Sequence, residues 1–254
     1  MARENFMGGD PHDDSPMPLD YFVWGLVSPD RIIVVDTGFD RAMADKRGRT
    51  LLKPLSDGLR AVGIEPATVE DVIITHMHYD HCGNHNLFPR ARFHVQDREM
   101  RFVTGRLMTH AAMRVPFEED DVVAMVRRVF NGRVVFHDGD DEIAPGVSVH
   151  HVGGHTMGMQ VVRVDTARGA VVLASDSSHL YANIEREIPY PIAYNVGEVL
   201  EGYRRVWALA ESREHVIPGH DPLVMARYPA ASPELEGWVV RLDAAESKLY
   251  LRAP

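Results

Sequence analysis

Short runs of apolar and β-branched residues, separated by polar turns, dominate the first part of the chain. Residues 21–27 and 31–36 predict two strands joined by the turn Ser28-Pro29-Asp30, because proline and aspartate are typical turn residues. Val72-Ile73-Ile74 predicts another buried strand, and residues 51–62 predict an amphipathic helix. This alternation of strands and helices is typical of α/β proteins.

The same pattern continues to the C-terminus with one interruption. Residues 97–130 lose the alternation, and two helical segments are expected there, roughly 97–113 and 118–130. Further strands are expected at 93–95, 133–136, 147–152, 159–164, 170–174, 215–217 and 239–242, and a helix at 197–209. No linker divides the chain, so we expect a single domain over residues 1–254, with comparable halves near 1–145 and 146–254.

Composition excludes several classes of protein. The 254 residues are 45% hydrophobic and 25% charged, which is ordinary for a globular protein, and the net charge of −10 disfavours nucleic acid as a partner. No run approaches the roughly 20 apolar residues of a membrane span, and residues 1–18 lack the apolar core of a signal peptide. The single cysteine, Cys82, suits a reducing compartment, so a cytoplasmic location is expected.

The stretch Thr75-His76-Met77-His78-Tyr79-Asp80-His81 carries the strongest chemical signal. Four metal-ligand side chains stand within six residues, directly after a predicted buried strand. A loop that leaves a strand end can fold all four around one centre, and imidazole with carboxylate suits zinc, manganese or iron. The alternative is a polar loop that is rich in histidine by accident.

Three later positions share this arrangement of a polar ligand after a buried strand. His155 lies in the turn Gly153-Gly154-His155-Thr156, Asp176 follows the run at 171–174, and His220 lies in Pro218-Gly219-His220-Asp221. Each alone is more typical of a turn or a cap than of a ligand. Loops at one edge of an α/β sheet converge, however, so together they indicate a metal site.

The pattern H-x-H-x-D-H, followed by G-G-H-T, a strand-end Asp and P-G-H, resembles the metallo-β-lactamase superfamily. Val35-Asp36-Thr37-Gly38 is similar to that family's early D-T-G turn, and the resemblance covers nearly the whole chain. It implies an αβ/βα four-layer sandwich, with two facing mixed sheets, helices outside and a metal site along one edge.

The resemblance also implies a role for each motif residue. His76, His78 and His155 match the ligands of a first metal ion, Asp80, His81 and His220 match those of a second, and Asp176 matches a bridging carboxylate. The expected cofactor is a pair of divalent ions, zinc first, with manganese or iron as alternatives. Two such ions can activate a bridging hydroxide for attack on an ester or lactone.

Among the branches of the family, the chain looks most like the N-acyl homoserine lactonases, which act in quorum quenching. A small lactone or ester is therefore the expected substrate, and a homodimer is left open. A thioesterase of the glyoxalase II type is the alternative, although Arg204, Arg205, Arg213 and Lys248 form no evident basic cluster for glutathione. A metal-binding domain without catalysis is the alternative outside enzymes.

Asp80, His179 and Tyr181 are the residues expected to take part in catalysis. The related lactonases place a tyrosine three residues after the bridging aspartate, and here that position is His179, with Tyr181 two residues further on. Either side chain could donate a hydrogen bond to the substrate carbonyl. Part of the segment 97–130 could roof the active site, the alternative being that its Met and Phe residues are core.

Overall fold

The computed structural model describes residues 1–246; residues 247–254, including Lys248, lie outside the described part. The chain divides into two compact units, each of which contains one sheet. Tyr21–Asp138 forms the first-sheet unit, and Met1–Asp20 together with Gly139–Pro254 forms the second-sheet unit. The first twenty residues thus belong with the C-terminal part of the chain.

The sheet of the first-sheet unit has five strands in the order β1-β2-β3-β4-β5. These are β1 (Trp24–Ser28), β2 (Arg31–Val35), β3 (Asp71–Ile73), β4 (Arg92–Gln96) and β5 (Val134–His137). The first two strands form the predicted hairpin, and β2 to β5 are parallel. Residues such as Val34, Val72 and Phe93 are wholly buried, as expected for central parallel strands covered on both faces.

The helices of this unit are mostly short. They are α1 (Arg41–Arg47), α2 (Leu55–Ala61), α3 (Tyr79–Cys82), α4 (Asp97–Val103), α5 (Ala111–Arg114) and α6 (Glu119–Phe130), with 3-10 turns η2 (Pro66–Thr68), η3 (His85–Leu87) and η4 (Arg106–Thr109). The single helix expected over 97–113 is wrong. The chain leaves the helix at Thr104, whose hydroxyl donates to the carbonyl of Met100, and it continues as η4 and α5.

The sheet of the second-sheet unit also has five strands, in the order β10-β9-β8-β7-β6. They are β6 (Asp141–Ala144), β7 (Val147–His151), β8 (Gln160–Thr166), β9 (Gly169–Ser175) and β10 (Val216–Pro218). Strands β9 and β10 are parallel, and the other neighbours are antiparallel. The strand expected at 239–242 is wrong, since Val240 forms only an isolated bridge with Ala230.

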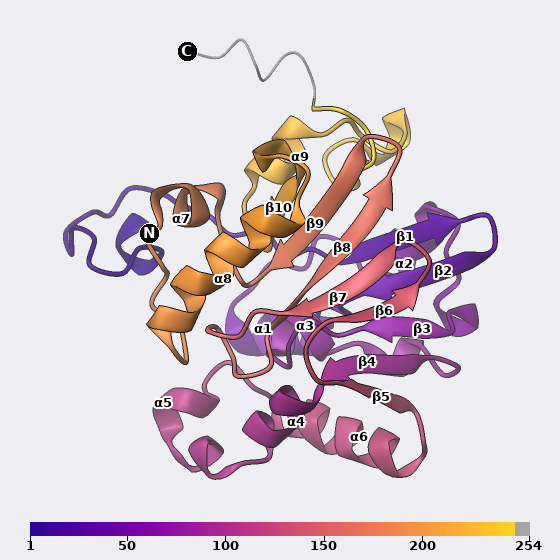
Figure 1. Cartoon of the computed structure of the whole chain (residues 1–254), viewed down its shortest axis with the longest axis horizontal. Coiled ribbons are helices and arrows are strands. Elements are labelled where there is room, and N and C mark those ends of the chain that lie inside the picture. The colour runs from indigo at the N-terminus through magenta and orange to yellow at the C-terminus, as the bar shows by residue number, and fades with distance from the viewer. Residues whose placement is uncertain (247–254) are drawn as a thin grey trace. The chain divides into compact units, whose positions relative to one another are not determined.

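Helix α8 (Val196–Leu209) covers one face of this second sheet (Figure 1). Val199, Tyr203 and Val206 recur at helical spacing and pack with sheet residues such as Val161 and Val172 in a buried cluster. The remaining helical elements of the unit are η1 (Ala2–Glu4), α7 (Tyr181–Arg186), η5 (Arg213–His215), α9 (Leu223–Arg227) and η6 (Pro233–Leu235). Within residues 1–246, no helix has the length and apolar character that a membrane crossing requires.

The fold class predicted from the sequence is confirmed. The chain builds two mixed sheets of five strands each, accompanied by helices, as in an αβ/βα sandwich. The strands that were expected to precede the candidate ligands, β3, β7, β9 and β10, all form. The ligand loops are therefore anchored on rigid strand ends.

Candidate metal centre

The first donor set lies in the loop that leaves β3. His76 and His78 stand on its extended part, while Asp80 and His81 lie on the single helical turn α3, and all four are buried. The ring centroids of His76 and His78 are 4.5 Å apart, and those of His76 and His81 are 4.1 Å apart. The change from extended chain to helical turn gathers the four side chains, which neither a regular strand nor a regular helix could do.

Asp36, at the end of β2, holds this loop in place. Its carboxylate accepts hydrogen bonds from the main-chain N–H and the hydroxyl of Thr75, both at 2.8 Å, and from Nδ1 of His81 at 2.7 Å. Parallel pairing of β2 with β3 brings the two strand ends to the same edge of the sheet. Because Nδ1 of His81 donates to Asp36, its Nε2 is left with the lone pair that a metal ion needs.

Cys82 follows the donor set but does not join it. Its side chain is wholly buried, its thiol donates to the carbonyl of Met77 at 3.4 Å, and burial raises the pKa of the thiol well above its ordinary value. A thiol that resists ionisation is a poor ligand and a poor nucleophile. Cys82 is therefore a packing residue.

The second donor set comes from three loops at one edge of the second sheet. His155 lies in the β7–β8 loop, Asp176 follows β9, and His220 follows β10. Because β7 and β10 both run parallel to β9, their C-terminal ends lie at the same edge. The topology therefore brings together three residues that are spread over 66 positions of sequence.

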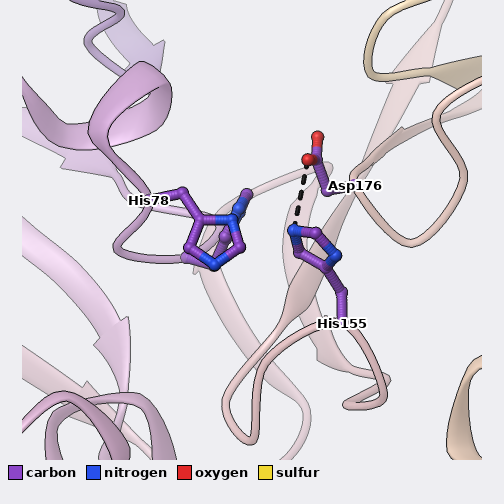
Figure 2. Close-up of side chains that lie close together, drawn as sticks. His78, His155 and Asp176 are labelled. Carbon is purple, nitrogen blue, oxygen red and sulfur yellow. Dashed lines mark ion pairs between the residues drawn. The ribbon is translucent and has the colours of Figure 1, made fainter. Parts of the chain in front are cut away.

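Asp176 is the centre of this set. Its carboxylate oxygens lie 3.2 Å from Nε2 of His155 and 2.9 Å from Nε2 of His220, and all three side chains are buried. Figure 2 shows the ion pair of His155 and Asp176. Figure 2 also labels His78, which belongs to the first donor set. Ser175, just before Asp176, adopts a left-handed backbone with φ of 45°, a strained conformation for this residue type.

The glycines that precede the two histidines leave no space for a side chain. Gly154 has φ of 83°, and a Cβ there would lie 2.5 Å from the main-chain nitrogen of Val199. A Cβ on Gly219 would lie 2.6 Å from a carboxylate oxygen of Asp176. Both positions therefore require glycine, which explains the two glycine motifs in physical terms.

The two histidines are held in one tautomer by main-chain carbonyls. Nδ1 of His155 donates to the carbonyl of Ile192 at 2.8 Å, and Nδ1 of His220 donates to the carbonyl of Asp20 at 2.7 Å. In the neutral rings, the Nε2 lone pairs then face the carboxylate of Asp176. Such an arrangement of lone pairs and negative charge is stable when a cation lies among them, so this donor set fits a divalent metal ion.

His179 also reaches this carboxylate. Its Nε2 lies 3.1 Å from Asp176, and its ring stacks on Tyr190 with centroids 3.5 Å apart. Burial lowers the pKa of His179 to about 4, although Asp176 opposes the shift. The neutral ring has a single N–H, and we assign it to Nε2, because the carboxylate of Asp176 can only accept a hydrogen bond.

The ring of Tyr181 packs against an arginine. The guanidinium of Arg227 lies 3.8 Å from the centre of its ring, and its main-chain N–H donates to Asp221. Tyr190 is the aromatic residue beside Asp176 instead: its hydroxyl donates to the main-chain carbonyl of Asp176, and its ring meets His155 edge-on at 5.3 Å. The sequence analysis missed Tyr190, which is separated from Asp176 by a helix and a turn and belongs to no motif.

Comparison with known proteins identifies a common family. The profile of the metallo-beta-lactamase superfamily matches residues 18–232. An N-acyl homoserine lactonase from a Bacillus species is 29% identical over 189 residues, which cover 68% of this chain and 70% of that protein. The N-acyl homoserine lactonase AiiA of Bacillus thuringiensis subsp. kurstaki is 27% identical over 165 residues, 64% of this chain and 60% of its own length.

A solved structure extends the likeness to the fold. An N-acyl homoserine lactone hydrolase with N-hexanoyl-L-homoserine bound at its catalytic metal centre superposes with a TM-score of 0.68 and 22% identity. The superposition covers 82% of this chain and 84% of that one.

Proposed function

Because this chain belongs to the metallo-beta-lactamase superfamily, we propose that it is a metal-dependent lactonase that opens an N-acyl homoserine lactone. The observation that carries the proposal is the buried carboxylate of Asp176, surrounded by imidazole nitrogens on an edge of the sheet. The substrate class is supported by the relatives, which are N-acyl homoserine lactonases.

Seven residues would hold the proposed pair of ions, shared between the ions as the family resemblance implies. The residues that would hold them are His76, His78, Asp80, His81, His155, Asp176 and His220. Imidazole and carboxylate donors without thiolate favour zinc, with manganese or iron as alternatives. When bound, two divalent ions supply the Lewis acidity that lowers the pKa of a shared water and polarises a carbonyl oxygen.

Neighbouring residues hold the donor side chains in fixed orientations. Asp36 and the carbonyls of Ile192 and Asp20 orient the imidazoles, so that each presents one fixed nitrogen. Burial of the donors excludes competing water and strengthens electrostatic interactions at the site. Preorganised ligands of this kind give tight and geometrically defined metal binding.

For His179 we propose an orienting role. A hydrogen bond from its Nε2 to Asp176, together with stacking on Tyr190, fixes the carboxylate. Its one N–H is thereby committed, which makes donation to a substrate carbonyl the less favoured role. Tyr181 is also a less favoured donor, because its ring packs against Arg227.

The decisive experiment combines metal analysis with a hydrolysis screen of the purified protein and its Asp176→Asn variant. The screen contains acyl homoserine lactones, simple γ- and δ-lactones and S-lactoylglutathione. We expect two metal ions per chain and lactone turnover, and a fall in turnover of about 10² or more for the variant together with loss of metal.

Asp165→Asn is the matched control, because it makes the same change on a side chain of β8 that is 57% exposed. It should retain both metal and turnover. Turnover of the thioester without turnover of any lactone would overturn the proposal and establish the glyoxalase II-like alternative, which the relatives do not favour.

A further inference from the structure

One apolar segment borders the first donor set. The ring of Phe117 meets the ring of His78 edge-on, with centroids 4.5 Å apart. The ring of Phe102 also meets that of Phe117 edge-on, with centroids 5.8 Å apart. Phe117, Met108 and Met113 are all partly exposed, so their apolar atoms reach solvent. Residues 107–118, called here the cover segment, thus carry apolar side chains that reach solvent, and one of them, Phe117, lies directly beside a proposed metal ligand.

The cover segment has little structure of its own. It contains the end of the 3-10 turn η4 and the four-residue helix α5, too short to be stable by themselves. Its position therefore depends on contacts with the rest of the first-sheet unit. Most of the polar contacts at its C-terminal end converge on one side chain, Arg47, the last residue of α1.

Arg47 binds the cover segment through three successive groups. Its guanidinium donates to the carbonyl of Val115 at 2.8 Å, to the carbonyl of Phe117 at 3.3 Å and to the carboxylate of Glu118 at 3.1 Å. The Arg47 side chain is only 18% exposed and that of Glu118 only 12%. Burial opposes ionisation of Glu118, but the bonds from Lys46 and Arg47 hold its pKa below the ordinary value.

The same guanidinium also contacts the ligand loop. It lies 4.2 Å above the ring centre of Tyr79, the residue between His78 and Asp80. The main-chain N–H of Tyr79 in turn donates to the carbonyl of Pro116 at 2.9 Å. Arg47 is therefore a single charged group that joins α1, the ligand loop and the cover segment.

From this geometry we propose that Arg47 is a specificity-determining positioning residue, which docks the cover segment against His78 and so sets the room for an apolar acyl group there. The substrate side of this inference rests on the proposed lactonase function, while the docking does not. Without Arg47, the segment would keep its covalent connections and lose its fixed position, so long acyl groups would lose a defined apolar surface.

The test compares Arg47→Met with Lys46→Met in the metal-loaded protein. Methionine keeps the apolar stem of Arg47 and removes every donor. Lys46→Met also removes a positive charge that is paired with Glu118. The side chain of Lys46 is 62% exposed, however, and an exposed ion pair contributes little to stability. Hydrogen exchange of the amides of residues 107–118 and of Tyr79 is measured, together with metal content and the kinetics of butanoyl and decanoyl homoserine lactones.

For Arg47→Met we expect exchange of these amides to become about tenfold faster or more, with two metals retained. The kcat/KM ratio of the decanoyl to the butanoyl substrate should fall about tenfold through a higher KM for the decanoyl one. Lys46→Met should change either quantity by less than about threefold. If Arg47→Met does not fold, two milder variants give the same comparison and keep most of the packing: Arg47→Lys loses the paired guanidinium donors, and Glu118→Gln loses the charge and one of the acceptor oxygens that these donors bind.

Unchanged exchange in the Arg47 variants would overturn the docking role. Faster exchange with an unchanged chain-length ratio would overturn the specificity role. Faster exchange in a protein that turns over no lactone would leave the docking established and refute the proposed function, so the two failures are distinguishable.

Discussion

Asp36 and Ser175 are two residues with left-handed backbones, and each stands at the end of a strand next to the candidate metal centre. Their φ angles are 62° and 45°, respectively, and both are buried. Non-glycine residues pay for this conformation, which persists only where surrounding contacts enforce it. At Asp36 those contacts are the bonds to Thr75 and His81, so the strained residue is also the one that positions a ligand.

Replacing Asp36 by asparagine should therefore weaken metal binding about 10- to 100-fold without unfolding the protein. Asparagine tolerates the left-handed backbone, but its amide must place an NH₂ where the carboxylate accepts hydrogen bonds. Titration with zinc against a competing chelator measures the change. Asp40→Asn, at the N-terminus of α1, is the control, because asparagine caps a helix as well as aspartate does. Equal zinc affinity in the two variants would refute the positioning role of Asp36.

Replacing His179 should lower turnover, whereas replacing Tyr181 should not. His179→Phe should lower turnover about 10- to 100-fold, because Asp176 loses a hydrogen-bond donor that orients it. Tyr181→Phe should leave turnover within about threefold, since its ring packs on Arg227. Both variants are assayed with their metal content determined. Normal turnover in His179→Phe combined with a loss in Tyr181→Phe would instead identify Tyr181 as the substrate's donor.

At the scale of elements, buried polar side chains on three neighbouring strands contact one another in a row. Asp71 on β3 accepts from His94 on β4 at 3.1 Å, and the other nitrogen of His94 lies 3.0 Å from His137 on β5. Arg92 also pairs with Asp71 at 2.7 Å, and Arg31 approaches it at 3.8 Å. These contacts fix the relative register of the three strands. The register in turn determines the position of the ligand loop that follows β3.

The buried side chain of His94 predicts that the stability of the protein depends on pH. Burial lowers the pKa of His94 below its ordinary value of 6.5; Asp71 opposes the shift, and His137 and Arg92 add to it. The unfolded state therefore takes up the proton more readily than the folded state, and the free energy of unfolding falls as the pH drops below 6.5. The contribution of neutral His94 to the free energy of unfolding is fully present above pH 6.5. It is lost as the pH falls from 6.5 toward the lower pKa that His94 has in the folded state.

His94→Asn should flatten this part of the profile. We expect the Tm of the metal-free variant to decline less between pH 7 and pH 5 than that of the unchanged metal-free protein, because asparagine does not titrate. His110→Asn, which alters an exposed histidine of the same unit, should keep the original slope. An identical slope in all three proteins would show that His94 does not contribute. Measuring the metal-free form separates His94 from the metal ligands.

At the scale of the whole molecule, the proposed metal ions are also expected to stabilise the fold. Each ion that binds only the folded state, at about 100 times its Kd, adds about 2.7 kcal/mol to the free energy of unfolding, so two ions add about 5 kcal/mol. For a chain of this size, removal of both ions by a chelator should lower Tm by about 10–20 °C.

Readdition of zinc should restore the Tm, whereas magnesium should not, because magnesium prefers oxygen donors and the donor sets are largely imidazole. Calorimetry with and without chelator measures both effects. A Tm that does not respond to chelation, in protein shown to have lost its metal, would mean that the donors are held in place without the ions.

The sequence by itself determined the chemical part of this protein. Ligand types and their place after buried strands are local properties, since a β-branched run predicts its own strand and the polar residues that follow it must lie at that strand's end. For this reason the seven candidate ligands could be named before any coordinates, while the family, the sandwich fold and the candidate roles of His179 and Tyr181 came from the resemblance of these motifs to a known family. Element boundaries were less certain: α1, β6 and the break after Val103 were missed, because short helices and edge strands carry weak periodicity.

Only the tertiary structure decided how the candidate residues are used. The carbonyl that orients His220 belongs to Asp20, 200 residues earlier, and the hydroxyl beside Asp176 belongs to Tyr190. Arg47 reaches the cover segment across 68 to 71 positions of sequence. The same structure brings Nε2 of His179 within 3.1 Å of Asp176 and packs the ring of Tyr181 against Arg227. Such contacts depend on which strand ends meet and which way side chains point, and neither follows from local patterns of hydrophobic and polar residues.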